Sequence, residues 1–130
     1  MGDMFNLSSR SLSRLEGVHP DLVRVVERAI EITEVDFAVT EGLRTLKRQK
    51  ELLAIGATRT LNSRHLTGHA VDLVAYEGGE ISWHWPLYYK IAHAMKAAAD
   101  ELGVKITWGG DWKSFKDGPH FQLTWSEYPA

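Results

Sequence analysis

The chain has 130 residues, of which 44% are hydrophobic and 25% are charged, a size and composition that fit one globular domain with a single core. Its formal net charge of -2 provides no broad basic surface for nucleic acid or an anionic membrane, and it contains no cysteine. Disulfides, thiolate metal sites and cysteine nucleophiles are therefore excluded, so any metal site must use histidine or carboxylate ligands. We expect one domain over residues 1–130 and a monomer.

The first residues lack the basic start and apolar stretch of a signal peptide, so we expect the chain to stay in a cytoplasm.

The amino-terminal half is predicted to contain two helices with one strand between them. A helix begins at Pro20, and its apolar residues share one face that is expected to pack in the core: Leu22, Val25, Val26, Ala29 and Ile30. Residues 37–40 form a short predicted strand, and a helix over 46–55 stops at Gly56. Arg44 therefore lies at a junction between strand and helix.

The carboxyl-terminal half is predicted to contain strands on both sides of one long helix. A strand begins at Ala70 and is followed by a hairpin turn over 76–80. Pro86 begins a second amphipathic helix, and residues 104–108 and 120–125 are predicted as the closing strands. Because the hairpins are short, we predict an α+β fold with a small central antiparallel sheet flanked by helices.

Asp72 interrupts the apolar run from 70 to 74, where a carboxylate is costly unless it is paired, hydrogen-bonded or bound to a metal. The sequence over 120–125 alternates strictly, so its side chains point to two opposite faces, with His120, Gln122 and Thr124 on the polar face and Phe121, Leu123 and Trp125 on the apolar face. If these two strands are neighbours, Asp72 and His120 meet across them.

His65 completes a candidate metal site with Asp72 and His120. Zinc commonly takes histidine nitrogen and carboxylate oxygen, and a catalytic site uses three protein ligands with the fourth position left to water. Asp117 stands three residues before His120 in the run Asp-Gly-Pro-His, and the Gly-Pro bend would let its carboxylate arch back over the metal. A carboxylate there would act as a general base toward water. By spacing alone, Arg44 is an ordinary surface arginine.

The other histidines and the tryptophans have structural interpretations. Three histidines are expected to be structural: His19, His84 and His93. His69 is either structural or faces a substrate, and the sequence leaves both possibilities open. The tryptophan-rich stretches 83–85 and 108–112 are expected in core and loop packing, because no basic residues are interleaved as in a platform that stacks nucleic-acid bases.

Residues 63–72, Ser-Arg-His-Leu-Thr-Gly-His-Ala-Val-Asp, resemble the S-x-H-x-x-G-x-A-x-D signature of the zinc peptidases that include D-Ala-D-Ala dipeptidases, D,D-carboxypeptidases and phage L-alanyl-D-glutamate endopeptidases. Residues 117–120 resemble the second signature of that family, an acidic residue three before the last ligand. The resemblance extends through residues 42–45 with Gln49 and through 108–112, and it covers nearly the whole chain. It implies the architecture that these peptidases share with hedgehog signalling domains, and it is strongest toward the small endolysins of phages that infect Gram-negative bacteria.

The resemblance implies a role for each candidate residue. Three residues match the ligands of one zinc ion: His65, Asp72 and His120. Asp117 matches the catalytic acid/base, and Arg44 matches the arginine that steadies the substrate carbonyl oxygen as it becomes an oxyanion. Ser63 matches a position that supports the site or touches substrate, and His69 is a further candidate for substrate binding. Dipeptidases of the family carry glutamate where this chain has Asp117, which favours the endolysin branch.

The activity that the resemblance implies is hydrolysis of the L-Ala–D-Glu bond in the peptide stem of bacterial peptidoglycan. An endolysin waits in the host cytoplasm until a holin opens the route to the wall, so we expect functional dependence on a holin without stable membrane association. Two alternatives remain open, a D,D-carboxypeptidase and a zinc-stabilised binding domain without turnover. Asp117 and Arg44 together favour an enzyme, and the acidic balance disfavours nucleic-acid binding.

Overall fold

A computed structural model describes residues 5–58, 60–114 and 116–129 of the chain. Its centre is an antiparallel sheet with the strand order β1-β2-β5-β4, and β3 forms a hairpin with β2. The strands are β1 (Phe37–Glu41), β2 (Ala70–Glu77), β3 (Glu80–Ser82), β4 (Ile106–Trp108) and β5 (His120–Leu123). The helices are α1 (Ser9–Arg14), α2 (Pro20–Ile32), α3 (Leu46–Ala54) and α4 (Trp85–Leu102), with the 3-10 turns η1 (Arg64–Thr67) and η2 (Gly109–Asp111). The predicted antiparallel α+β class is therefore confirmed.

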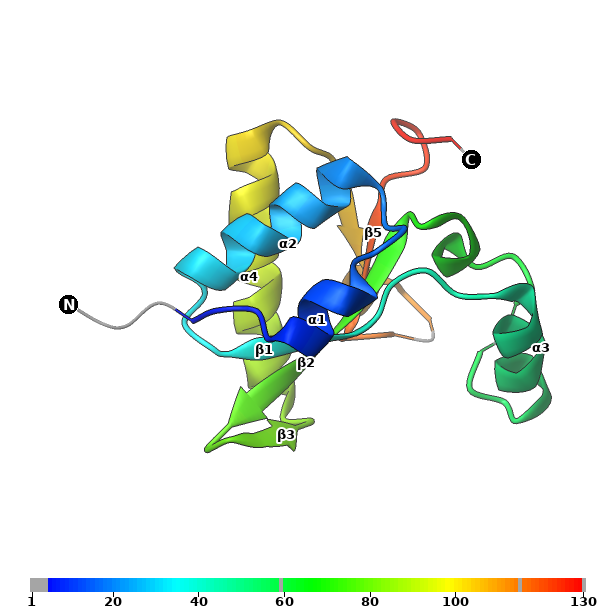
Figure 1. Cartoon of the computed structure of the whole chain (residues 1–130), viewed down its shortest axis with the longest axis horizontal. Coiled ribbons are helices and arrows are strands. Elements are labelled where there is room, and N and C mark those ends of the chain that lie inside the picture. Colours follow the sequence, from blue (N-terminus) through cyan, green and yellow to red (C-terminus); the bar gives the residue numbers. More distant parts are fainter. Residues whose placement is uncertain (1–4, 59, 115, 130) are drawn as a thin grey trace.

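Helices α2 and α4 lie against each other and cover one face of the sheet, whereas α3 stands apart on the other side of the molecule (Figure 1). The five residues predicted on the apolar face of α2 are all buried. Gly103 ends α4 in the left-handed conformation (φ 71°), which a glycine adopts at little cost. Between the helices and the sheet lies the core, to which β2 contributes Val71 and Leu73 and β5 contributes Phe121.

A β-bulge at Thr40 changes which face of the sheet the end of β1 presents. Val39 pairs with Leu73, but Glu41, two residues on, pairs with Asp72, so Thr40 is the extra residue. In a regular strand Glu41 would follow Val39 into the core, because side chains alternate with a period of two. The bulge instead brings Glu41 beside Asp72, on the face that points away from the core.

The structure corrects the sequence predictions for one strand, one helix and the burial of one side chain. The sequence 120–125 was expected as one strand with Trp125 on the apolar face, but β5 ends at Leu123 and Trp125 is 45% exposed. Helix α1 was not predicted; Ser8 caps it by accepting a hydrogen bond from the backbone of Ser11. Arg44, an ordinary surface arginine by spacing, has a side chain only 8% exposed.

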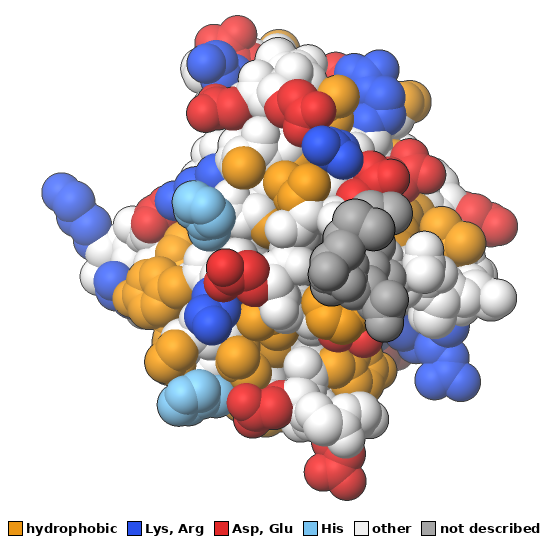
Figure 2. Space-filling view, turned by 90° about the vertical axis from the view of Figure 1, so that its left-hand side faces the viewer, with side chains coloured by type: hydrophobic (Ala, Val, Ile, Leu, Met, Phe, Trp, Pro, Cys, Tyr) orange, Lys and Arg blue, Asp and Glu red, His pale blue; other side chains and the backbone are white. Residues whose placement is uncertain are grey.

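The surface is mixed in charge on the face that Figure 2 shows, where acidic and basic side chains lie interspersed and no broad positive patch is visible among the described residues. Hydrophobic side chains are exposed between them. None of the described helices combines the length and the apolar character that crossing a membrane requires.

Candidate metal centre and active-site cavity

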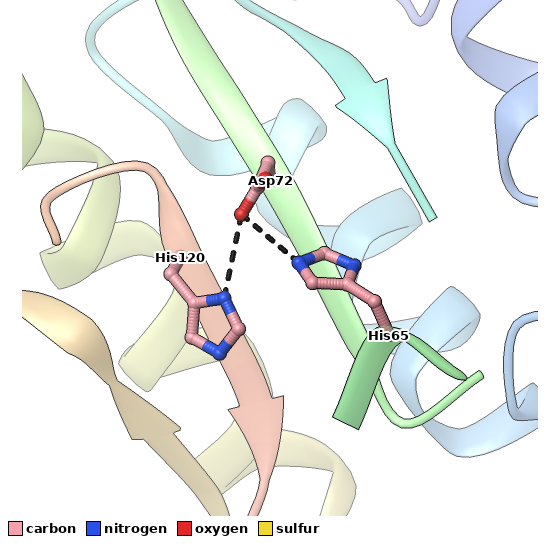
Figure 3. A group of neighbouring side chains, drawn as sticks. All are labelled: His65, Asp72 and His120. Atoms are coloured by element: carbon pink, nitrogen blue, oxygen red, sulfur yellow. Dashed lines mark hydrogen bonds and ion pairs between the residues drawn. The ribbon is translucent and has the colours of Figure 1, made fainter. Parts of the chain in front are cut away.

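Three side chains from η1, β2 and β5 meet on the face of the sheet opposite the core. The Asp72 Oδ1 atom lies 3.3 Å from the His65 Nε2 atom and 3.4 Å from the His120 Nδ1 atom. Figure 3 shows both imidazole rings directed at this carboxylate. One potential ligand atom from each residue falls within 4.8 Å of the others, so the three predicted ligands do come together in one cluster.

The backbone explains why these residues meet. Asp72 and His120 are direct partners in the antiparallel register of β2 and β5, as the alternation of the sequence predicted. His65 is placed by η1, because the Ser63 Oγ accepts a hydrogen bond from the His65 backbone and caps the turn. Gly68 closes the turn with φ 75°, and a side chain at this position would overlap the carbonyl oxygen of Gly17. The chain can therefore turn at Gly68 and enter β2 at Ala70.

The second nitrogen of each imidazole is held by a further partner. His65 Nδ1 donates a hydrogen bond to the Gly42 carbonyl at 2.8 Å, which leaves its Nε2 as the atom directed at Asp72. His120 Nε2 donates to the Gln122 side-chain oxygen at 2.8 Å, which leaves its Nδ1 as the inward-facing atom. Partners of this kind fix the tautomer and orientation of metal-binding histidines. Two neutral imidazole nitrogens and one carboxylate oxygen suit a divalent metal ion, so the residues present fit the expected metal.

The electrostatics of the cluster centre on Asp72. Burial raises the pKa of the Asp72 carboxyl, but the hydrogen bonds with His120 and His65 outweigh burial and hold that pKa well below its usual range. Burial lowers the pKa of His120, yet the hydrogen bond and the negative charge of Asp72 raise it above its ordinary value. The negative charge of Asp72 therefore favours a proton on His120. A bound metal ion would displace that proton.

Asp117 lies at the edge of the cluster in a turn that is held by three hydrogen bonds. Its backbone N–H donates to the Gly109 carbonyl at 3.1 Å, and its own carbonyl accepts from the His120 backbone at 3.2 Å. The Trp108 indole donates to the Gly118 carbonyl at 2.7 Å and fixes the turn from the core side. Burial, followed by the negative charge of Asp72, raises the pKa of the Asp117 carboxyl. A carboxyl with a raised pKa beside this candidate metal site is suited to accept and return a proton.

Arg44 reaches the cluster from the loop between β1 and α3. Its guanidinium donates to the Gln49 side-chain oxygen at 2.7 Å and to the Glu41 carboxylate, and it lies 3.8 Å from the Asp72 Oδ2 atom. Gln49 is fully buried and also donates to the Thr60 carbonyl. The sequence reasoning missed Glu41, because a carboxylate at the end of a strand gives no local sign of the bulge that turns it toward Arg44.

An open cavity of about 780 Å³ surrounds the cluster. The lining includes the predicted site residues Arg44, Ser63, His65, Asp72, Asp117 and His120. His69 is not among the described lining residues; its ring lies against His19, with 5.5 Å between centroids, and its Nδ1 is 2.7 Å from the Thr67 hydroxyl. The structure therefore brings every predicted site residue except His69 to one cavity.

Comparison with known proteins identifies a peptidase family. A family model described as phage L-alanyl-D-glutamate peptidase matches residues 3–124. The L-alanyl-D-glutamate peptidase of Escherichia phage T5 is 32% identical over 117 residues, which cover 87% of this chain and 85% of that protein. The crystal structure of the Serratia marcescens L-Ala D-Glu endopeptidase ChiX is similar with a TM-score of 0.91 and 53% identity, covering 96% of this chain and 95% of that one.

A more distant structure shares the fold alone. The vancomycin resistance D,D-dipeptidase VanXYg has a TM-score of 0.54 and 19% identity, and the similarity covers 82% of this chain and 50% of that one. The fold, the His-Asp-His cluster and the open cavity together define a peptidase with a metal-binding centre. The chain belongs to the phage L-alanyl-D-glutamate peptidase family.

Proposed function

We propose that this chain is an endopeptidase that hydrolyses the L-Ala–D-Glu bond in the peptide stem of peptidoglycan and acts in host cell lysis as a phage endolysin. The observation that carries the proposal is the cluster of His65, Asp72 and His120 in an open cavity of a chain of this family. We assign these three side chains as the ligands of one zinc ion. Zinc in such a site polarises a carbonyl group and lowers the pKa of water.

The remaining site residues have roles that follow from their positions. Asp117, whose pKa is raised, would accept the proton of the attacking water and deliver it to the leaving amine of D-Glu. Arg44 is a fixed positive donor beside Asp72, held by Glu41 and Gln49, and would stabilise the carbonyl oxygen as negative charge develops on it. Ser63 keeps η1 in the conformation that directs His65 into the cluster.

The proposal includes how the chain works in a cell. We propose that residues 1–130 act as a single catalytic domain and as a monomer, that the enzyme waits in the host cytoplasm, and that a holin gives it access to the wall. Direct contact with the holin is not required, because a membrane lesion is sufficient for passage. We propose that residues 1–130 recognise the substrate through the cavity and its rim.

Mass spectrometry of the fragments released from Gram-negative sacculi, with and without a chelator, tests the function. We expect free peptides that begin at D-Glu, glycan that still carries L-Ala, and loss of both products on chelation. Release of terminal D-Ala alone would replace the proposal with a D,D-carboxypeptidase. Bound zinc without any released fragment would identify a binding domain that performs no turnover.

A further inference from the structure

Trp125 is an exposed aromatic side chain on the wall of the cavity, where the sequence pattern had placed it in the core. The chain leaves β5 after Leu123, and a turn in which the backbones of Glu127 and Tyr128 both donate to the Thr124 carbonyl brings Trp125 to the surface. Trp125 is 45% exposed and lines the cavity that contains the His65–Asp72–His120 cluster. Its position therefore calls for an explanation other than core packing.

Arg64 packs against one face of the Trp125 ring. The Arg64 guanidinium carbon lies 3.8 Å from the ring centroid, and its Nη2 donates to the carbonyls of Leu123 and Tyr128, on either side of Trp125. Arg64 is only 3% exposed, and burial lowers its pKa. One face of the indole is thus fixed on a buried cation and contributes a cation–π contact. The orientation of the ring is set before any substrate arrives.

The two ends of the cavity differ in the side chains that they expose. Asp117 precedes β5, and near it lie Arg44, Glu41 and Asp72, whereas Trp125 follows the other end of the strand. The four residue steps from His120 to Thr124 correspond to about 13 Å in extended chain. The described lining residues next to Trp125 in the sequence, Thr124 and Ser126, are uncharged, and Thr107 pairs its hydroxyl with that of Thr124 at 2.9 Å. The cation at this end, Arg64, is only 3% exposed and lies against the indole.

The two sides of an L-Ala–D-Glu bond also differ from each other. D-Glu and the residues beyond it carry carboxylates, while L-Ala is joined through an amide to the lactyl group of muramic acid, so the sugar side has no charge near the bond. L-Ala and the lactyl group together are about as long as two extended residues, roughly 7 Å. With the scissile carbonyl at the His65–Asp72–His120 cluster, that spacing and the length of an indole side chain would bring the sugar ring toward Trp125.

We propose that Trp125 is a specificity residue that stacks on the muramic acid sugar of the glycan strand, with Arg64 as the positioning residue that holds the indole. The inference rests on the proposed function and extends it, since it assigns the glycan side of the substrate to the Trp125 end of the cavity. The exposed indole offers a flat apolar face to the C–H groups of a pyranose ring, and the Thr124 and Ser126 hydroxyls offer hydrogen bonds beside it.

Two substrates with the same scissile bond test this assignment. One is a muramyl stem peptide, and the other is the same peptide with an acetyl group on L-Ala in place of the sugar. For Trp125→Ala we expect kcat/KM to fall by about tenfold on the muramyl substrate, mainly through KM, the size of effect that one aromatic contact produces. The acetyl substrate should be cleaved as by the unaltered chain, and Trp125→Phe should restore most of the loss.

The matched control is Trp83→Ala, since Trp83 is 66% exposed but is not among the described cavity-lining residues. It should leave both substrates unaffected. An equal loss on both substrates with Trp125→Ala, or no loss on either, would overturn the role in sugar recognition while L-Ala–D-Glu cleavage itself remained. Cleavage of a different bond by the unaltered chain, seen in the product masses, would overturn the proposed function and this inference with it.

Discussion

Asp117→Asn should separate catalysis from metal binding. The side chain of Asp117 is not one of the three clustered ligands, and the substitution keeps its size, so the metal should still bind. Removal of a proton-transfer group lowers turnover by about 100-fold to 10,000-fold. That loss corresponds to about 2.7 to 5.4 kcal/mol of transition-state stabilisation.

The same substitution should not destabilise the metal-free fold. Burial and then the charge of Asp72 raise the pKa of Asp117, which means that the ionised carboxylate is less favourable in the folded chain than in the unfolded one. The free energy of unfolding therefore declines as the pH rises from the pKa of this group in the unfolded chain to its pKa in the folded chain. Above that interval the ionised Asp117 destabilises the fold by the full amount. Asparagine has no charge to desolvate, so the melting temperature in chelator should stay equal or rise.

The assay measures three quantities on one preparation: zinc content, the melting temperature in chelator and the cleavage rate on a stem peptide. Asp72→Asn is the matched contrast, because it removes the charge of a proposed ligand and should lose zinc together with activity. Near-normal turnover by Asp117→Asn would refute the acid/base role. If this variant lost its zinc, Asp117 would belong to the ligand set and the proposed division of labour would be wrong.

Three further changes address the support around the metal. Gly42→Ala places a methyl group against the Arg14 carbonyl and displaces the Gly42 carbonyl that orients His65. It should lower the free energy of unfolding in denaturant by about 1–3 kcal/mol and also weaken zinc binding. Unchanged unfolding and zinc affinity would contradict the close contact between Gly42 and the Arg14 carbonyl. Gln122→Ala should reduce zinc affinity in a competition titration by about 10-fold to 100-fold, because His120 loses its partner, with the fold seen by circular dichroism unchanged. Zinc affinity should fall as the pH drops from 8 through about 6.5, because protons compete with the metal for the histidines. The fall should begin above the ordinary histidine range, since the pKa of His120 is raised. A constant affinity over this interval would argue against histidine ligation.

Local patterns predicted the pairing at the centre of the site. The alternation in 120–125 and the carboxylate within the apolar run at Asp72 were enough to place Asp72 opposite His120, because side chains in a strand repeat with a period of two. The apolar face of α2 was equally clear, since its periodicity is that of a helix. Spacing also indicated His65 and Asp117, the resemblance to a known family added Arg44 and Ser63, and the structure brings all four to the cavity.

The sequence did not predict features that depend on tertiary contacts. Arg44 is buried because Glu41 and Gln49 surround it, and Glu41 reaches it only through a bulge that leaves no mark on the local pattern. Trp125 was placed wrongly because alternation does not reveal where a strand stops hydrogen-bonding. His69 remained undecided from sequence, and its ring lies against His19, which is distant along the chain.

The direct pairing of Asp72 with His120 also links catalysis to folding. A slip of one residue between β2 and β5 would turn His120 toward the core and separate it from the carboxylate, although the strands would still form backbone hydrogen bonds. A misaligned chain would therefore have near-normal secondary structure and no intact ligand set. Zinc uptake during refolding would consequently report correct strand alignment, which circular dichroism alone does not distinguish.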